Sequence, residues 1–193
     1  KSRFIEGAIQ NNIEKKEASK IFDLVDKFAG YGFNKSHAAA YAMIAYQTAY
    51  LKANFPLEFL CSLMNCDIGN FEKISSYCNE VKKFNFKMFK PDINNSQARF
   101  EVIYKDEHPI GINFGLSAIK NIGENSVIEI VKERKKNGKF SSLLNLLKRL
   151  NNSTLNKKII EALILSESLK SLEDNQNFLI QNATILVTLV AIN

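Results

Sequence analysis

The sequence predicts a mainly α-helical protein with one small β-sheet or hairpin near its middle. Apolar residues recur at three- and four-residue spacing over most of the chain, which is typical of amphipathic helices. Residues 86–114 alternate apolar and polar side chains around a turn, which favours strands. With 193 residues and 46% apolar content, the chain can form one domain or two small ones around a buried core.

The order of these patterns predicts four segments. They are a helical bundle over residues 1–85, a β-containing connector over 86–114, a second helical domain over 115–172 and an atypical tail over 173–193. The tail ends in NATILVTLVAIN, an apolar run that is β-prone and too short to span a bilayer, but that could also begin another helix. Because Lys1 already lies inside a helical pattern, we expect it not to be a natural domain boundary.

The first 27 residues predict two amphipathic helices, separated by the charged run 14–17. A longer helix is expected from Ser36 to the break at Pro56, because alanine is abundant and no helix breaker intervenes. Further helices are predicted within 57–64, 71–84, 116–120, 125–136, 143–149 and 155–165. Together these elements place most of the chain in helices.

The stretch from Phe28 to Tyr50 contains the clearest candidate binding feature. Gly30 and Gly32 precede a polar run that ends at His37, and Ser36 is a good candidate for the N-cap of the following helix. A helix N-terminus attracts anions, because its first N–H groups lack partners and the dipole is positive there. Lys35 and His37 would add donors, so this junction predicts a phosphate site; the alternative is a core helix preceded by an ordinary loop.

Charge and cysteine usage limit the class of protein. The net charge of +6 and pI near 9.1 favour a polyanionic partner. Cys61, Cys66 and Cys78 lack paired CxxC spacings and no signal peptide precedes them, so we expect reduced thiols in a cytoplasmic protein without a membrane partner. His108 lies in a charged turn beside Pro109, where a solvated histidine is expected.

Three motifs resemble one family, in the same order. YGFNKSHAAAYA followed by AYQTAYLKANFPLEF is similar to the fingers region of the bacterial C-family replicative DNA polymerases. KPDINNSQARF resembles that family's PDVN segment, and FGLSAIKNIGENSVIEIVKER resembles its helix-hairpin-helix. The resemblance runs from about Arg3 to about Leu172. It implies a fragment made of fingers, connector and helix-hairpin-helix domain.

The resemblance also implies residue roles. The incoming deoxynucleotide (dNTP) would be bound by Tyr31, Asn34, Lys35, Ser36 and His37, and primer-template DNA by Lys120, Asn121, Gly123 and Glu124. In the hairpin, the glycine would let a DNA backbone approach, and the N–H groups of the helix N-terminus would hold a phosphate. The remaining implied partners are the rest of the polymerase, the replisome subunits and Mg²⁺.

The resemblance does not extend to catalytic residues in this chain. Polymerases hold two divalent ions with carboxylates, which in this family lie in the palm, upstream of the fingers. Asp23 and Asp26 fit the solvent face of a helix better, so no catalytic or metal-binding residue is predicted and the Mg²⁺ ligands are expected elsewhere. Two alternatives stay open: a non-catalytic, sequence-independent DNA-binding module, and a degenerate remnant of the polymerase gene.

Two features near the predicted hairpin also stay open. The basic residues Lys132, Arg134, Lys135 and Lys136 would assist DNA binding if they faced the same side, but could equally form a solvated helix end. The segments 143–149 and 155–165 predict a second, degenerate hairpin. Where the family reads LI.AGAFD.L, residues 163–169 read LILSESL, which puts close packing at that corner in doubt.

Overall fold

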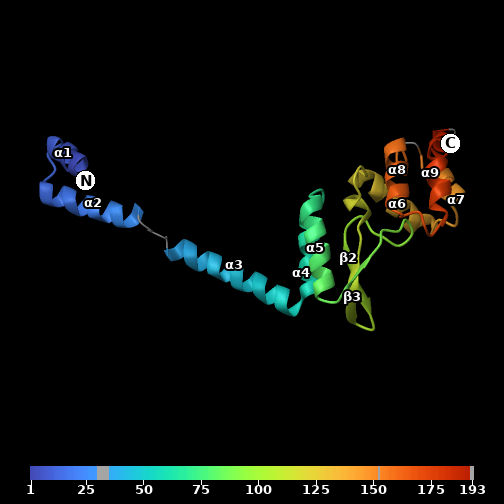
Figure 1. Cartoon of the computed structure of the whole chain (residues 1–193), viewed down its shortest axis with the longest axis horizontal. Coiled ribbons are helices and arrows are strands. Elements are labelled where there is room, and N and C mark those ends of the chain that lie inside the picture. Colours follow the sequence, from blue (N-terminus) through green and yellow to red (C-terminus); the bar gives the residue numbers. More distant parts are fainter. Residues whose placement is uncertain (30–34, 152, 192–193) are drawn as a thin grey trace. The chain divides into compact units, whose positions relative to one another are not determined.

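The computed structural model describes residues 1–29, 35–151 and 153–191 (Figure 1). Its contacts divide the chain into two compact units, Lys1–Tyr50 and Leu51–Asn193. The described part of the chain is mainly helical with one three-stranded sheet, which confirms the predicted fold class.

The first unit contains the two predicted amphipathic helices. Their bounds are α1 Ser2–Gln10 and α2 Lys15–Ala29. The rings of Phe4 and Phe22 lie 5.5 Å apart between them, and Ala18 is fully buried. Asn12 adopts a positive φ of 61° in the turn, a conformation that asparagine tolerates.

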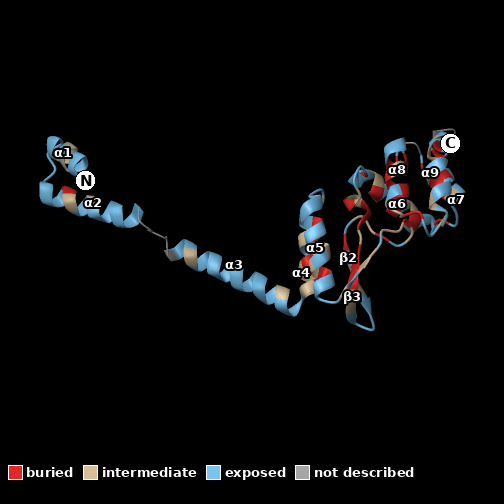
Figure 2. Cartoon of the chain, viewed as in Figure 1, coloured by how far each residue is buried: buried red, intermediate tan, exposed pale blue. Residues whose placement is uncertain are grey.

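Helix α3 (Lys35–Asn54) begins in the first unit and ends at the start of the second. With Ser36 as N-cap the helix would begin at His37, so it begins two residues earlier than predicted, and Ser36 is its second residue. None of the side chains described along it is buried, as the pale colour of α3 in Figure 2 shows. The helix is stabilised locally by its alanines, because Ala has the highest helix propensity.

The second unit begins with a core between two helices and the sheet. The elements are α4 (Pro56–Cys66), α5 (Phe71–Lys83), β1 (Lys87–Phe89), β2 (Glu101–Lys105) and β3 (His108–Asn113). The strand order is β1-β3-β2, with β1 parallel and β2 antiparallel to β3. Leu57, Leu60, Met64 and Ile112 are fully buried between the helices and the sheet. This confirms the predicted small sheet, including its β2–β3 hairpin.

A second, larger core lies among the helices that follow. These are η1 (Leu116–Ala118), α6 (Glu124–Asn137), α7 (Leu143–Arg149), α8 (Lys157–Leu165), α9 (Gln176–Gln181) and α10 (Ala183–Ala191). Ile130 from α6, Leu146 from α7 and Leu163 from α8 are at most 1% exposed within it. Figure 2 shows buried residues throughout these helices. These helices therefore form a domain around a core of their own.

The loop that connects the two cores is held by two asparagine side chains. Asn65 makes two hydrogen bonds with the backbone of Phe100, at 2.9 and 3.0 Å. Asn94 makes two with the backbone of Phe140, both at 2.8 Å. Each amide thereby satisfies a backbone donor and an acceptor at once, as a neighbouring strand would. The segment KPDINNSQARF is thus a structural connector between the sheet and the helical core.

The structure decides two C-terminal features that the sequence left open. Residues 183–191 of the β-prone run form the helix α10, because Leu186 and Val190 are buried in the second core, and tertiary packing overrides strand propensity. The corner at residues 163–169 is closely packed: Ser168 is fully buried and its hydroxyl donates to the carbonyl of Leu163 at 3.0 Å. The hydroxyl groups of Ser166 and Ser168 also lie 2.7 Å apart, so hydrogen bonds of serine hold this corner.

Candidate nucleic-acid interface

The predicted hairpin lies between η1 and α6 and is built around one buried side chain. Ile122 is 6% exposed and anchors the turn in the second core. Its N–H donates to the carbonyl of Ile119 at 3.2 Å. Asn121 has a φ of 70°, so this residue, and not the glycine, adopts the left-handed conformation that the turn requires. The flanking Lys120, Asn121 and Gly123 are exposed.

Gly123 is not required by the fold. Its φ of −76° and ψ of 145° suit any residue, and a Cβ at this position would meet no atom within 4 Å. Gly115 differs, because a Cβ there would lie 2.5 Å from the carbonyl carbon of Arg99. A glycine that neither the backbone nor the packing demands leaves open space over the start of α6.

That open space adjoins unpartnered backbone donors. Gly123 is the N-cap of α6 and has no side chain to accept from the first-turn N–H groups, which therefore stay available to an anion. Glu124 begins the helix and is exposed; its carboxylate lies 3.5 Å from the guanidinium of Arg99. The Glu124 carboxylate thus pairs with Arg99. At the hairpin, Glu124 would contact a ligand through its backbone N–H and not through its side chain.

A lysine that sequence reasoning missed lies beside the hairpin. Lys158, from the first turn of α8, lines one surface depression together with Lys120, Asn121 and the acidic Glu161. The hairpin and the start of α8 therefore present two lysines to one depression, and the Glu161 carboxylate there lies 3.9 Å from Lys157. The signal in the sequence is the pair Lys157-Lys158 directly after Asn156. Asn156 is a good N-cap residue, so the two lysines are expected at the start of a helix.

The basic run at the end of α6 does not face one side. Arg134 is 7% exposed and donates a 2.7 Å hydrogen bond to the carbonyl of Ile93, and burial lowers the pKa of its guanidinium. Lys132, Lys135 and Lys136 are exposed. Arg134 therefore does not face the same side as the three lysines, as a shared role in DNA binding would require. Its side chain instead stabilises the fold through the contact with Ile93.

The predicted nucleotide-binding residues belong to the first unit. Tyr31 and Asn34 lie outside the described residues, and so does the side chain of Lys35, which begins α3. Ser36 and His37 are exposed in the first turn, where the rings of His37 and Tyr41 lie 4.3 Å apart. His37 is thus oriented by an aromatic neighbour one helical turn away.

Across residues 1–29, 35–151 and 153–191, no group of three or more His, Cys, Asp or Glu side chains could hold a metal ion. None of the helices in this described part is long and apolar enough to cross a membrane.

A comparison with family models identifies the class of domain that contains the hairpin. A family model described as a helix-hairpin-helix motif matches residues 85–179, which contain η1, the hairpin and α6 together with α7 and α8. The second unit thus contains a helix-hairpin-helix protein domain.

Comparison with curated proteins then specifies the family. The chain is 46% identical over 180 residues to DNA polymerase III subunit alpha of Buchnera aphidicola subsp. Schizaphis graminum, covering 93% of this chain and 15% of that protein. The same subunit of Borreliella burgdorferi is 44% identical over 188 residues, covering 97% and 16%. That of Escherichia coli K12 is 44% identical over 166 residues, covering 86% and 14%.

These matches confirm the resemblance inferred from the three motifs. The chain is homologous to a segment of the DNA polymerase III alpha subunits. It spans about 15% of the length of the curated relatives it matches.

Proposed function

We propose that the chain is part of a replicative DNA-directed DNA polymerase, which elongates a primer with deoxynucleotides. Its own contribution is contact with duplex DNA through the hairpin and with the incoming nucleotide at the start of α3. The homology to DNA polymerase III alpha subunits supports the first statement. The open hairpin supports the contact with duplex DNA.

The observation that carries the DNA-binding proposal is the unoccupied space at Gly123. The fold does not need a glycine here, so the absent side chain serves whatever approaches from outside. A phosphate of the DNA backbone fits, because the first turn of α6 has no side-chain cap and a helix N-terminus attracts anions. Such contacts position a duplex without reading its sequence.

Two cations support the same assignment. Lys120 and Lys158 line the depression beside Asn121, and neither forms an ion pair within the described ranges. Each phosphate that they neutralise releases counterions, which makes binding weaker as salt increases. We therefore add Lys158, which shares a depression with Lys120 and Asn121, to the residues proposed to contact DNA phosphates beside Gly123 and the backbone N–H of Glu124.

The experiment compares two glycine-to-valine variants of the 193-residue chain. Gly123→Val should weaken binding of a fluorescent primer–template duplex about tenfold, because the side chain fills the phosphate space. Gly7→Val, in α1, is the matched control, since a Cβ there also meets no atom within 4 Å. Fluorescence anisotropy over a salt series measures both affinities, and thermal unfolding checks that both variants stay folded.

A third variant sharpens the same measurement. Lys158→Ala should reduce the slope of log affinity against log salt by about one, as expected for the loss of one phosphate contact. Equal affinities for Gly123→Val, Gly7→Val and the unchanged chain would contradict the hairpin assignment.

The nucleotide contacts are proposed from the residues around the start of α3. His37 and Lys35 would bind the triphosphate of the dNTP, Tyr31 would pack at its sugar or base, and Asn34 and Ser36 would shape the loop. Support comes from the exposure of Ser36 and His37 in the first turn of α3, where a phosphate would meet the positive end of the helix dipole. The imidazole can donate to a phosphate when neutral or protonated.

A chimera tests this part of the proposal. This chain would replace the aligned segment of the Escherichia coli alpha subunit, with which it is 44% identical. We expect primer extension, and we expect His37→Ala in the chimera to raise the KM for dNTP about tenfold while duplex affinity stays unchanged. A His37→Ala chimera with the parental KM would contradict a triphosphate contact.

The remaining partners are proposed at the level of the whole polymerase. Mg²⁺ would be held by carboxylates outside this chain, since no described cluster fits a metal ion. The rest of the polymerase and the replisome subunits would be protein partners, in the cytoplasm.

A further inference from the structure

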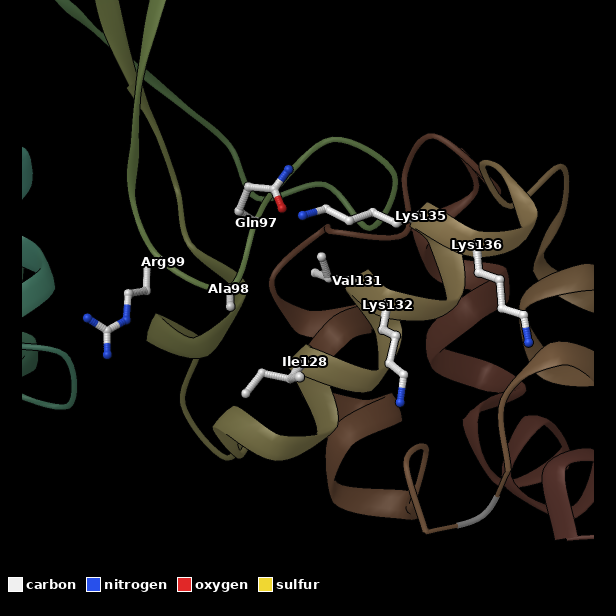
Figure 3. A pocket seen from close by; sticks show the side chains of 8 residues that line it. All are labelled: Gln97, Ala98, Arg99, Ile128, Val131, Lys132, Lys135 and Lys136. Carbon is white, nitrogen blue, oxygen red and sulfur yellow. The ribbon is translucent and has the colours of Figure 1, made fainter.

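A groove runs along one face of α6, next to the face that this helix buries, and Val131 belongs to both faces. Its second wall is the extended segment Gln97–Arg99, which precedes β2. Figure 3 shows the apolar side chains of Ala98, Ile128 and Val131 between Arg99 on one side and the lysines of α6 on the other. The groove lies entirely within the second unit.

The floor of the groove is aliphatic and partly open. Ile128 is 46% exposed, although Ile130, two residues further along, is fully buried in the second core. Val131 is 8% exposed and joins Ile128 on the groove side. Side chains at positions i, i+3 and i+4 share one face of a helix, so Ile128, Val131 and Lys132 form a continuous stripe. From Ile128 to Lys136 the groove follows α6 for about 12 Å, at roughly 1.5 Å per residue.

The rim of the groove is basic. Arg99, Lys132, Lys135 and Lys136 all line it, and no acidic side chain does. Arg99 and Lys132 make only exposed ion pairs, with Glu124 at 3.5 Å and Glu129 at 3.4 Å, and such pairs contribute little stability. Among the residues that the structure describes, Lys135 and Lys136 have no ion-pair partner. The groove therefore complements an acidic ligand.

The aliphatic floor decides which acidic ligand fits. Nucleic acid would bring phosphates, which gain nothing from an aliphatic surface, or bases, which stack on aromatic rings. None of the residues that line the groove is aromatic. An amphipathic peptide segment instead offers aliphatic anchors for the floor and carboxylates for the rim in one element.

We propose that this groove binds an acidic amphipathic segment of a partner protein. One or two aliphatic side chains of the segment pack on Ile128 and Val131, while its carboxylates pair with Arg99, Lys132 and Lys135. The groove shares no lining residue with the phosphate site at Gly123, although the ion pair between Arg99 and Glu124 joins the two. The proposal does not depend on DNA binding. It adds a protein-docking surface to a domain whose proposed ligand is DNA.

The probe is a labelled peptide of about twelve residues with leucines at positions i, i+3, i+4 and i+7 and Asp or Glu elsewhere. Two control peptides separate the contributions. One has the same composition with the leucines distributed around the helix, and the other keeps the leucine stripe but replaces each acid with Gln or Asn. Fluorescence anisotropy with the full 193-residue chain should give a Kd on the order of tens of micromolar for the striped acidic peptide and at least about tenfold weaker binding for both controls.

Variants of the chain locate the binding. Ile128→Glu should weaken the striped peptide about tenfold or more, because a carboxylate replaces an aliphatic contact and repels the ligand. Leu144→Glu is the matched control: Leu144 is 52% exposed on α7, outside the groove, and the change in net charge is the same. Lys135→Glu should also weaken binding about tenfold, and Lys148→Glu, on α7, should change it little.

Three results would overturn the proposal. The first is equal binding of the striped and redistributed peptides, which would mean non-specific charge attraction. The second is an equal effect of Ile128→Glu and Leu144→Glu in variants shown to be folded by circular dichroism. The third is displacement of the striped peptide by duplex or single-stranded DNA, together with weaker DNA binding by Ile128→Glu. That result would mean that the groove binds nucleic acid.

Discussion

Helices α3 and α6 both begin at a predicted phosphate site, yet they use their apolar residues in different ways. α6 buries Val127 and Ile130 in a core that this chain completes, and only Ile128 is an exposed large apolar side chain on it. α3 carries apolar residues all round, and Tyr46 and Met43 are 66% and 58% exposed. The stability of α6 therefore comes from tertiary packing and that of α3 from local propensity, which alone supports only marginal helices.

The largest expected difference between the two helices is in the free energy of unfolding after isoleucine truncation. Ile130→Ala in α6 should lower it by about 2–5 kcal/mol, because a fully buried side chain leaves a cavity. Ile44→Ala in α3 removes a side chain that is 54% exposed and should change it by less than about 0.5 kcal/mol. Urea denaturation followed by circular dichroism measures both, and equal losses would show that α3 is packed as tightly as α6.

A smaller effect distinguishes structural from solvated charges within α6. Arg134→Met should cost about 1–3 kcal/mol, because it leaves the carbonyl of Ile93 without its 2.7 Å hydrogen bond. Lys135→Met, at the neighbouring exposed position, should change stability by less than about 0.5 kcal/mol. The same denaturation measurement applies. If the two variants lost equal stability, the contact between Arg134 and Ile93 would contribute nothing.

The smallest expected effect is pH-dependent and is specific to α6, because α3 contains no Asp or Glu. A hydrogen bond from Asn137 and a second from Arg149 lower the pKa of Glu133 below its ordinary value. A lowered folded-state pKa stabilises the protein above the unfolded pKa, and that stabilisation is lost as the pH falls through the folded value. The stability advantage over Glu133→Gln should therefore be present at neutral pH and shrink below about pH 4.5.

Denaturation of both proteins at several pH values between neutral and about pH 3 measures this difference. The control is Glu129→Gln, because the Glu129 carboxylate meets only the exposed Lys132, at 3.4 Å. A constant difference between the unchanged chain and Glu133→Gln at every pH would mean that the two hydrogen bonds do not favour the charged carboxylate.

Much of this fold was predictable because its signals are local. Helical periodicity and the break at Pro56 place most of the elements. The hairpin followed from the short pattern Asn121-Ile122-Gly123-Glu124, and the homology followed from three motifs in one order. Such patterns depend on neighbours in the chain, so they are present before any tertiary contact forms.

Other features required the folded chain. Whether Arg134 faces solvent depends on the position of Ile93, 41 residues away, and whether residues 183–191 form a strand or a helix depends on the core they enter. Lys158 joins Lys120 only because α8 packs beside the hairpin. The sequence by itself determined the helices up to residue 165, the hairpin and the family, since these are encoded by local spacing. Tertiary structure alone decided which charges are buried and which meet, because burial and proximity are set by residues distant in the chain.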